Sequence, residues 1–564
     1  MKEGFRQSMA WLHTWTGLVV GWVLFFVFLT GTAGYIQIEL TRWMQPERPL
    51  QGQAIPSVDD QFAKAYHWLQ KNPDTQQAER WGIDFISDQR GRDQLNVNWS
   101  MPPAKGENYG KYQRENLNPV TGEKVEEQAK PRETGGGRAL YDMHYALHYI
   151  PYDWAIRIVG ICTMFMFVAI ITGIITHKKI FKDFFTFRGA KGQRSWLDGH
   201  NVLSVIALPF HIMITYSGLI FFINAYMPLG VPLVYGFGDD NQKRYYAELY
   251  PQYYSTDADA KSLVMKDVAP NWQQVQVIYN QAKQEWGQTG IGSVNFYPAK
   301  GDSPAKVEFY KSDYDFIGRS RGKSLQFDLA SGQQIGDKDS TAEKGALKFG
   351  NVLLGLHVGW FATPFLRWMY VITGLVGTAM IATGLVLWTV KRRPKQIKNG
   401  KMSFGHALVE RLNIALIAGL PLGIAIYFWA NRLLPVTMEN RAAWEMHSLF
   451  LCILFALIYA IVRAIPKAWF ELLLLTTLAY LLLPIVNSLT TDRGMWVTWQ
   501  HQDWTLFSID LGFILLGLLF VWISYAVWRK RNAILKAPVK KAREPRKPTT
   551  AVVEKTIADD GDKS

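Results

Sequence analysis

Long apolar stretches alternate with polar segments along the whole chain. The apolar stretches lie near residues 12–34, 150–176, 201–224, 358–390, 407–430, 446–464, 468–487 and 506–528. A helix rises about 1.5 Å per residue, so about 20 apolar residues cross a hydrocarbon layer roughly 30 Å thick. The pattern therefore predicts a polytopic α-helical membrane protein with about eight transmembrane helices.

The first and third apolar stretches repeat each other. Aligned without a gap, they place His13 on His200, Thr30 on Ser217 and Gly31 on Gly218. The polar segments that follow them, 35–149 and 225–357, also correspond. Each has a helical pattern, then alternating strand patterns, then a glycine-containing turn, which is typical of a small α+β module.

The repeat predicts a duplicated unit, which consists of a span, an external module and a second span. Residues 1–180 and 195–395 form the two copies, and a pseudo-twofold axis along the membrane normal relates them. The four later spans have no counterpart in this repeat. The expected segments are 1–34 (first span), 35–149 (first module), 150–180 (second span), 181–200 (cytoplasmic loop), 201–224 (third span), 225–357 (second module), 358–395 (fourth span), 396–530 (C-terminal bundle) and 531–564 (disordered tail).

The charge of the chain sets the expected orientation. The formal net charge is +14, and the basic residues gather just after the second, fourth and eighth spans. Because such clusters mark the cytoplasmic side, both termini should be cytoplasmic and both modules external. In a bacterium this describes a multi-pass protein of the inner membrane with periplasmic modules. Since the basic residues lie beside spans, they do not indicate a nucleic-acid partner.

Histidines at the ends of the spans are the candidate chemistry. His13 and His200 open the first and third spans at their cytoplasmic ends, and His148 and His357 lie at the external ends of the second and fourth spans. Each pair is related by the repeat, so each could meet on the pseudo-twofold axis. Two imidazoles facing each other in a four-helix bundle suit a six-coordinate b-type haem. We expect two b haems, one near each face of the membrane.

Other polar residues leave the pairing open. His177 and His211 could each replace one of the four ligands, and His144, one turn before His148, could be an external ligand or a hydrogen-bond donor behind one. Arg157 and Arg367 hold nearly equivalent positions in the two copies. They could pair with the anionic haem propionates or with carbonyl groups inside the bundle.

Several motifs resemble one known family. They are LHTWTGL at 12–18, HNVLSVIALPFH at 200–211, LH at 147–148 and 356–357, TG at 172–173 and 383–384, and the NPVTGE turn at 118–123. Over roughly residues 1–395 the chain resembles the PepSY-associated transmembrane family, which includes haem-binding reductases of ferric siderophores in the bacterial inner membrane. The resemblance implies a role in iron acquisition, with electrons passing through haem to a periplasmic ferric siderophore that releases Fe(II).

Two classes of function compete. The first is this haem-dependent ferric-siderophore reductase. The chain has no flavin or nicotinamide fingerprint, so its electron donor would be a separate molecule, either a quinol or a cytoplasmic reductase. The second is a siderophore or haem transporter, or a non-enzymatic binding or sensing protein. The C-terminal spans, which carry Arg441, Glu445, His447, Arg463 and Asp510, could hold a quinone or serve as an accessory bundle.

Overall fold

The structure is a computed structural model. It describes residues 3–50, 55–86, 94–103, 110–126, 130–177, 192–249, 263–268, 271–286, 291–301, 303–311, 317, 324–335, 345–398, 400 and 402–530. Most of the expected cytoplasmic loop 181–200 and the whole tail 531–564 lie outside the described residues.

The polytopic helical fold is confirmed. In the described residues, seven long apolar segments qualify as membrane spans, and one bent helix pair makes an eighth. The seven are α1 (Glu3–Gly34), α6 (Tyr152–Thr176), α16 (Pro364–Lys398), the joined α17 (Phe404–Asn413), η3 (Ile414–Ala418) and α18 (Gly419–Leu433), then α19 (Arg441–Val462), α20 (Ile465–Thr490) and α22 (Trp504–Lys530).

The third span is broken rather than continuous. It consists of α8 (Gln193–Ile206) and α9 (Leu208–Phe221), which meet at Ala207 with a bend of 69°. Pro209 stands in the first turn of α9. Since proline has no N–H and its ring clashes with the preceding turn, it favours a new helix start over helix continuation. The apolar run 201–224 contained this break without showing it in its hydropathy.

Each copy also has a short helix before its second span. This helix is α5 (Gly136–Ala146) in the first copy and α15 (Gly345–Val358) in the second. α5 packs on α1, and α15 packs on α9. The fourth span therefore begins at Pro364, after a turn through Gly359 (φ 62°), and not at residue 358 as the apolar pattern suggested.

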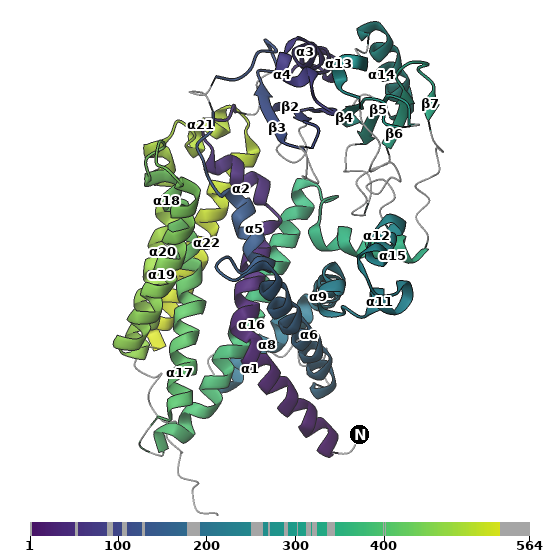
Figure 1. Cartoon of the computed structure of the whole chain (residues 1–564). Helices are drawn as coiled ribbons and strands as arrows, with labels where there is room; N and C mark the ends of the chain where they lie inside the picture. The colour runs from purple at the N-terminus through teal and green to yellow at the C-terminus, as the bar shows by residue number, and fades with distance from the viewer. Residues whose placement is uncertain are drawn as a thin grey trace, which may run out of the picture.

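The two modules share one antiparallel sheet at one end of the membrane helices (Figure 1). Its order is β3-β2-β1-β4-β5-β6-β7. The central strands β1 and β4 come from different copies and pair antiparallel, with Trp81 opposite Phe296 and Ile83 opposite Val294. The strands are β1 (Arg80–Asp84), β2 (Leu95–Ser100), β3 (Tyr112–Leu117), β4 (Ile291–Tyr297), β5 (Lys306–Lys311), β6 (Ser324–Asp328) and β7 (Gln334–Ile335). A twofold axis between β1 and β4 relates the copies.

Two helices cover the sheet face that is remote from the membrane helices (Figure 1). They are α3 (Val58–Lys71) and α14 (Trp272–Trp286), where Phe62 and Tyr279 bury their rings 4.6 Å apart. Asp59 of α3 pairs with Lys283 of α14 at 2.9 Å. The two segments between the spans of each copy also contain the short helices α4 (Pro73–Gln76), α10 (Ile223–Tyr226), α11 (Gly230–Tyr235), α12 (Asp239–Leu249) and α13 (Met265–Val268).

The predicted equivalent turns have the same backbone shape. Gly122 (φ 77°) and Gly332 (φ 70°) both adopt the left-handed conformation that glycine tolerates best. The N–H of each donates to the carbonyl four residues earlier, of Asn118 at 2.8 Å and of Asp328 at 2.9 Å. The repeat of the two modules thus extends to single hydrogen bonds.

The C-terminal helices form a separate bundle against α1 and α2 (Gln37–Met44), shown in green to yellow in Figure 1. Its buried charged residues are partnered within the protein. Arg42 of α2 donates to Asp503 at 2.7 Å, and Trp43 donates to Asp510 at 2.8 Å. Arg441 pairs with Glu445, whose carboxylate also accepts from Thr134. These charges fasten the bundle to the first repeat. α21 (Met495–Gln500) joins α20 to α22.

Candidate haem-binding site

Four histidines meet as two pairs inside the duplicated unit. The rings of His13 on α1 and His200 on α8 have their centres 6.2 Å apart. The rings of His144 on α5 and His357 on α15 have their centres 6.1 Å apart. Each pair takes one histidine from each copy, as the pseudo-twofold axis requires.

Every one of these rings rests on the same local structure. Nδ1 of His13 is 2.8 Å from the Ala169 carbonyl, and Gly173 follows four residues later with its backbone against the ring. The other three rings have the same arrangement. His200 binds the Met380 carbonyl beside Gly384, His144 binds the Val27 carbonyl beside Gly31, and His357 binds the Ile214 carbonyl beside Gly218.

The hydrogen bonds fix the protonation pattern of the rings. A carbonyl oxygen only accepts, so Nδ1 must carry the proton in His13, His144 and His200. His357 Nδ1 is also 2.8 Å from Ser217 Oγ, whose own proton goes to the Met213 carbonyl at 2.6 Å. Nε2 is then left with its lone pair, and the described residues give it no hydrogen-bond partner in any of the four rings. This is the state in which histidine binds metals.

The spacing of the rings suits a shared metal ion. Metal–imidazole bonds of about 2 Å place the centres of two opposed rings about 6 Å apart. The glycines leave room for the rings at this spacing. A Cβ at Gly31 would lie 2.4 Å from His144 Nδ1, and one at Gly384 would lie 3.0 Å from His200 Cε1. Within the described residues, no group of three or more His, Cys, Asp or Glu could hold a metal by itself. The residues fit a porphyrin iron with two axial histidines.

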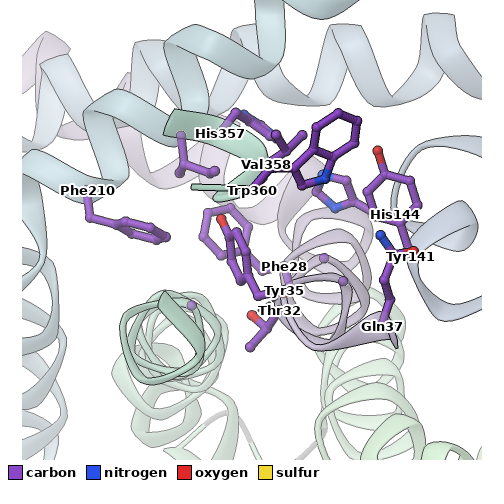
Figure 2. Close-up of a pocket in the computed structure, with 14 residues that line it drawn as sticks. Phe28, Thr32, Tyr35, Gln37, Tyr141, His144, Phe210, His357, Val358 and Trp360 are labelled. Carbon is purple, nitrogen blue, oxygen red and sulfur yellow. Dashed lines mark hydrogen bonds between the residues drawn. The ribbon is translucent and has the colours of Figure 1, made fainter. Parts of the chain in front are cut away.

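A pocket lies at the pair of His144 and His357, which we call the outer pair because of the expected orientation (Figure 2). It has about 530 Å³ of empty volume, including the space at its mouth. His144 and His357 lie among mainly aromatic and small side chains, and Phe28, Tyr35, Tyr141, Phe210 and Trp360 supply the aromatic rings. Such a mostly apolar cavity, lined by aromatic rings and by two convergent polar groups, is suitable for an aromatic cofactor.

The outer pair differs from the expected one, because His144 and not His148 faces His357. Leu147 and His148 both have positive φ, 50° and 34°, where the chain turns from α5 into α6. This turn points His148 away from the pair, and its ring stacks on Phe450 of the C-terminal bundle at 5.5 Å. Its neighbour Tyr149 hydrogen-bonds His447.

The sequence signal for the outer pair was ambiguous. Aligned on the glycines of their TG motifs, the two copies place His357 opposite Ala146. Ala146 lies midway between His144 and His148, so the spacing favours neither histidine. The position of the glycine is a better guide to which histidine belongs to the pair. Gly31 lies one helix turn after Val27, whose carbonyl binds His144, and it leaves space for that ring.

His211 and His177 lie outside both pairs. The bend at Ala207 separates His211 from His200, so the two do not share one helix face as a straight span would have it. His211 is buried, its ring lies 6.4 Å from that of Phe28, and its Nε2 has no hydrogen-bond partner in the described part of the chain. His177 caps the end of α6, four residues after Gly173.

The two arginines hold different positions. Arg367 forms an ion pair with Glu39 of α2, beside the outer pocket. Arg157 is exposed on α6 and lies over the Trp154 ring, 5.6 Å from its centre. Neither contact is with a backbone carbonyl, which was one of the two expected roles.

The outer pair lies outside the candidate spans, and burial controls its charge. Burial lowers the pKa of His144, and burial together with the neighbouring His144 lowers the pKa of His357 to about 3. Both imidazoles are therefore neutral near pH 7, as ligation requires.

The family comparison covers the duplicated unit. The family model for the PepSY-associated TM region matches residues 10–391, which is about two thirds of the chain and nearly all of the duplicated unit. The chain belongs to this family. A comparison with curated proteins finds no match. In this PepSY-associated TM protein all four paired histidines fall inside the matched residues, and the C-terminal bundle falls outside them.

Proposed function

We propose that the protein transfers electrons across the membrane through two b-type haems, held by His13 with His200 and by His144 with His357, to a ferric siderophore outside. The observation that carries this proposal is the double pair of imidazoles about 6 Å apart, each with Nδ1 engaged and Nε2 open. Bound haem would supply one-electron chemistry at each pair.

The protein's own residues position the two sites in series. His13 lies on α1, and so does Val27, whose carbonyl holds His144. About four helix turns separate them, so the two pairs lie roughly 20 Å apart along the helix, on the way from one membrane face to the other. His144 and His357 of the outer pair both line the pocket (Figure 2).

The ferric siderophore follows from the family resemblance and from iron chemistry. Hard oxygen donors bind Fe(III) more tightly than Fe(II), so one-electron reduction lowers the affinity of the chelate for its iron. The shared sheet above the membrane helices offers the larger surface on which such a chelate could dock.

Haem quantification with histidine variants tests the proposal. The purified protein should show a Soret band and sharpened α and β bands after reduction. We expect His13→Ala, His200→Ala, His144→Ala and His357→Ala each to lose about half of the bound haem. His148→Ala should keep all of it, and His67→Ala in the first module serves as a control. A preparation that stays colourless despite ample haem during expression favours a transporter or binding protein instead.

A further inference from the structure

The end of the membrane helices remote from the sheet carries a row of four aromatic rings. Trp11 and Trp15 of α1 lie 6.5 Å apart, Trp15 and Trp388 of α16 lie 6.4 Å apart, and Trp388 stacks on His406 of α17 at 6.0 Å. The row begins at the surface, where Trp11 is 64% exposed, and ends inside, where His406 is 2% exposed. It therefore leads from the lipid-facing surface to a buried imidazole.

His406 and Trp388 hold polar atoms that the fold does not satisfy. Both ring nitrogens of His406 and Nε1 of Trp388 are buried without a hydrogen-bond partner among the described residues. His406 Nε2 is 3.3 Å from Glu410 Oε1, close enough for ion pairing but not aligned for a hydrogen bond. Arg393 already binds that carboxylate oxygen. Buried polar groups without a partner cost free energy, so a ligand that hydrogen-bonds these atoms would be favoured here.

The row also lies beside the inner histidine pair. Trp388 follows Gly384, the glycine against His200, by one helix turn, which is a rise of about 6 Å. On the other side α17 continues into the π-helical turn η3, an uncommon element that is frequent at functional sites. Asn413, at that junction, accepts from Trp22 of α1 and donates to the Leu385 carbonyl. The same contacts thus connect the row to α1, which carries His13, and to α16, whose Met380 carbonyl holds the His200 ring.

We propose that this row is the site where a membrane quinol docks and is oxidised, with His406 as its proton acceptor. The inference rests on the proposed electron transfer. A quinol is a flat aromatic ring that reaches the protein through lipid, can pack against the exposed indole ring of Trp15 and donates its hydroxyl protons to an imidazole. A protein reductase could not reach the buried end of the row.

The atoms and electrons of this reaction balance with the residues described above. Oxidation of one quinol to the quinone breaks two O–H bonds and releases two electrons and two protons. The electrons leave singly toward the His13 and His200 pair, and two ferric chelates outside take one each. His406 accepts the two protons in turn, Glu410 stabilises the imidazolium, and each proton then passes to water at that face of the membrane.

The test follows haem reduction in the purified, haem-loaded protein. Duroquinol should reduce the wild type, and His406→Leu should slow that reduction at least tenfold while dithionite still reduces its haem fully. His447→Leu is the matched control, because His447 lies in the C-terminal bundle away from the row, and should behave as wild type. As a readout independent of haem, quinone should quench tryptophan fluorescence of the apoprotein saturably, and more weakly in His406→Leu.

The outcomes separate the two proposals. Haem that dithionite reduces but duroquinol does not, or equal duroquinol rates in wild type and His406→Leu, would overturn the quinol site and leave electron transfer standing. A protein that binds no haem at all would overturn electron transfer itself. If His406→Leu does not fold, Trp388→Leu gives the same comparison from the other side of the stack.

Discussion

At the residue scale, the position of a histidine ring depends on the glycine that it packs against. His144 approaches α1 closely only because Gly31 has no Cβ, which would otherwise sit 2.4 Å from Nδ1. The same helix carries Gly17, where an added Cβ would meet nothing within 4 Å. Replacing Gly31 therefore tests the space beside an imidazole, whereas replacing Gly17 tests only the effect of glycine on helix stability.

Gly31→Ala should displace His144 and release one of the two haems, as measured by the pyridine haemochrome assay. Gly17→Ala should keep both haems, and it should stabilise α1 slightly because alanine favours helix by about 1 kcal/mol over glycine. Full haem content in Gly31→Ala would mean that His144 is not a ligand.

Acid should weaken the outer site through His357. Its pKa is about 6.5 in the unfolded chain and about 3 in the fold, where burial disfavours the charged ring. Below pH 6.5 the unfolded state takes up a proton that the folded state refuses, so stability falls as the pH drops toward 3. At pH 5 this amounts to about 2 kcal/mol. Melting temperatures of the apoprotein at pH 7 and pH 5 should differ less in His357→Phe than in wild type. Equal differences would contradict the buried, neutral state of this ring.

At the element scale, hydropathy predicted where the spans lie but not where they break. An apolar helix and two apolar helices joined at Ala207 have the same average hydrophobicity, and Pro209 gave the only local signal. The sequence favoured His148 and left His144 as an alternative for a similar reason, because α5 and the turn at Leu147 are too short to leave a periodic pattern. The inner pair was predictable, since both of its members sit at matched positions in a gapless repeat.

Pro209→Ala tests the bend. With proline gone, residue 209 regains an N–H, and a straight helix across Ala207 becomes more favourable by about 3 kcal/mol. Straightening would move α8 and His200 away from His13, so we expect the variant to lose haem from the inner site first. Leu208→Ala is the control beside it. The inner and outer haems should be resolved by their separate midpoint potentials in a redox titration.

At the scale of the whole molecule, the C-terminal bundle braces the outer site. Arg42 and Asp503 are buried, with side-chain exposures of 2% and 0%, and they join the start of α22 to α2. α2 in turn packs on α5, where Gly137 N–H donates to Thr41 Oγ1 at 2.9 Å, and α5 carries His144. A charge pair in the bundle can therefore act on a histidine that it does not touch.

Asp503→Asn should leave Arg42 as an uncompensated buried charge and cost about 3–5 kcal/mol of stability. Haem should leave the outer site before the inner one as the temperature rises, which absorbance melting would record. The exposed pair of Arg463 and Glu471 offers the matched comparison, and Glu471→Gln should cost under about 1 kcal/mol. Equal losses from the two variants would show that the buried pair does not brace α2.

The seam between β1 and β4 has one more consequence. A polypeptide with a single copy of the repeat would carry β1 as an open edge, and open edges attract another strand. Two such single-repeat chains would pair through that edge and would bring four equivalent imidazoles together, two from each chain. Gene duplication followed by fusion would then have made permanent a partnership that two separate subunits could already form.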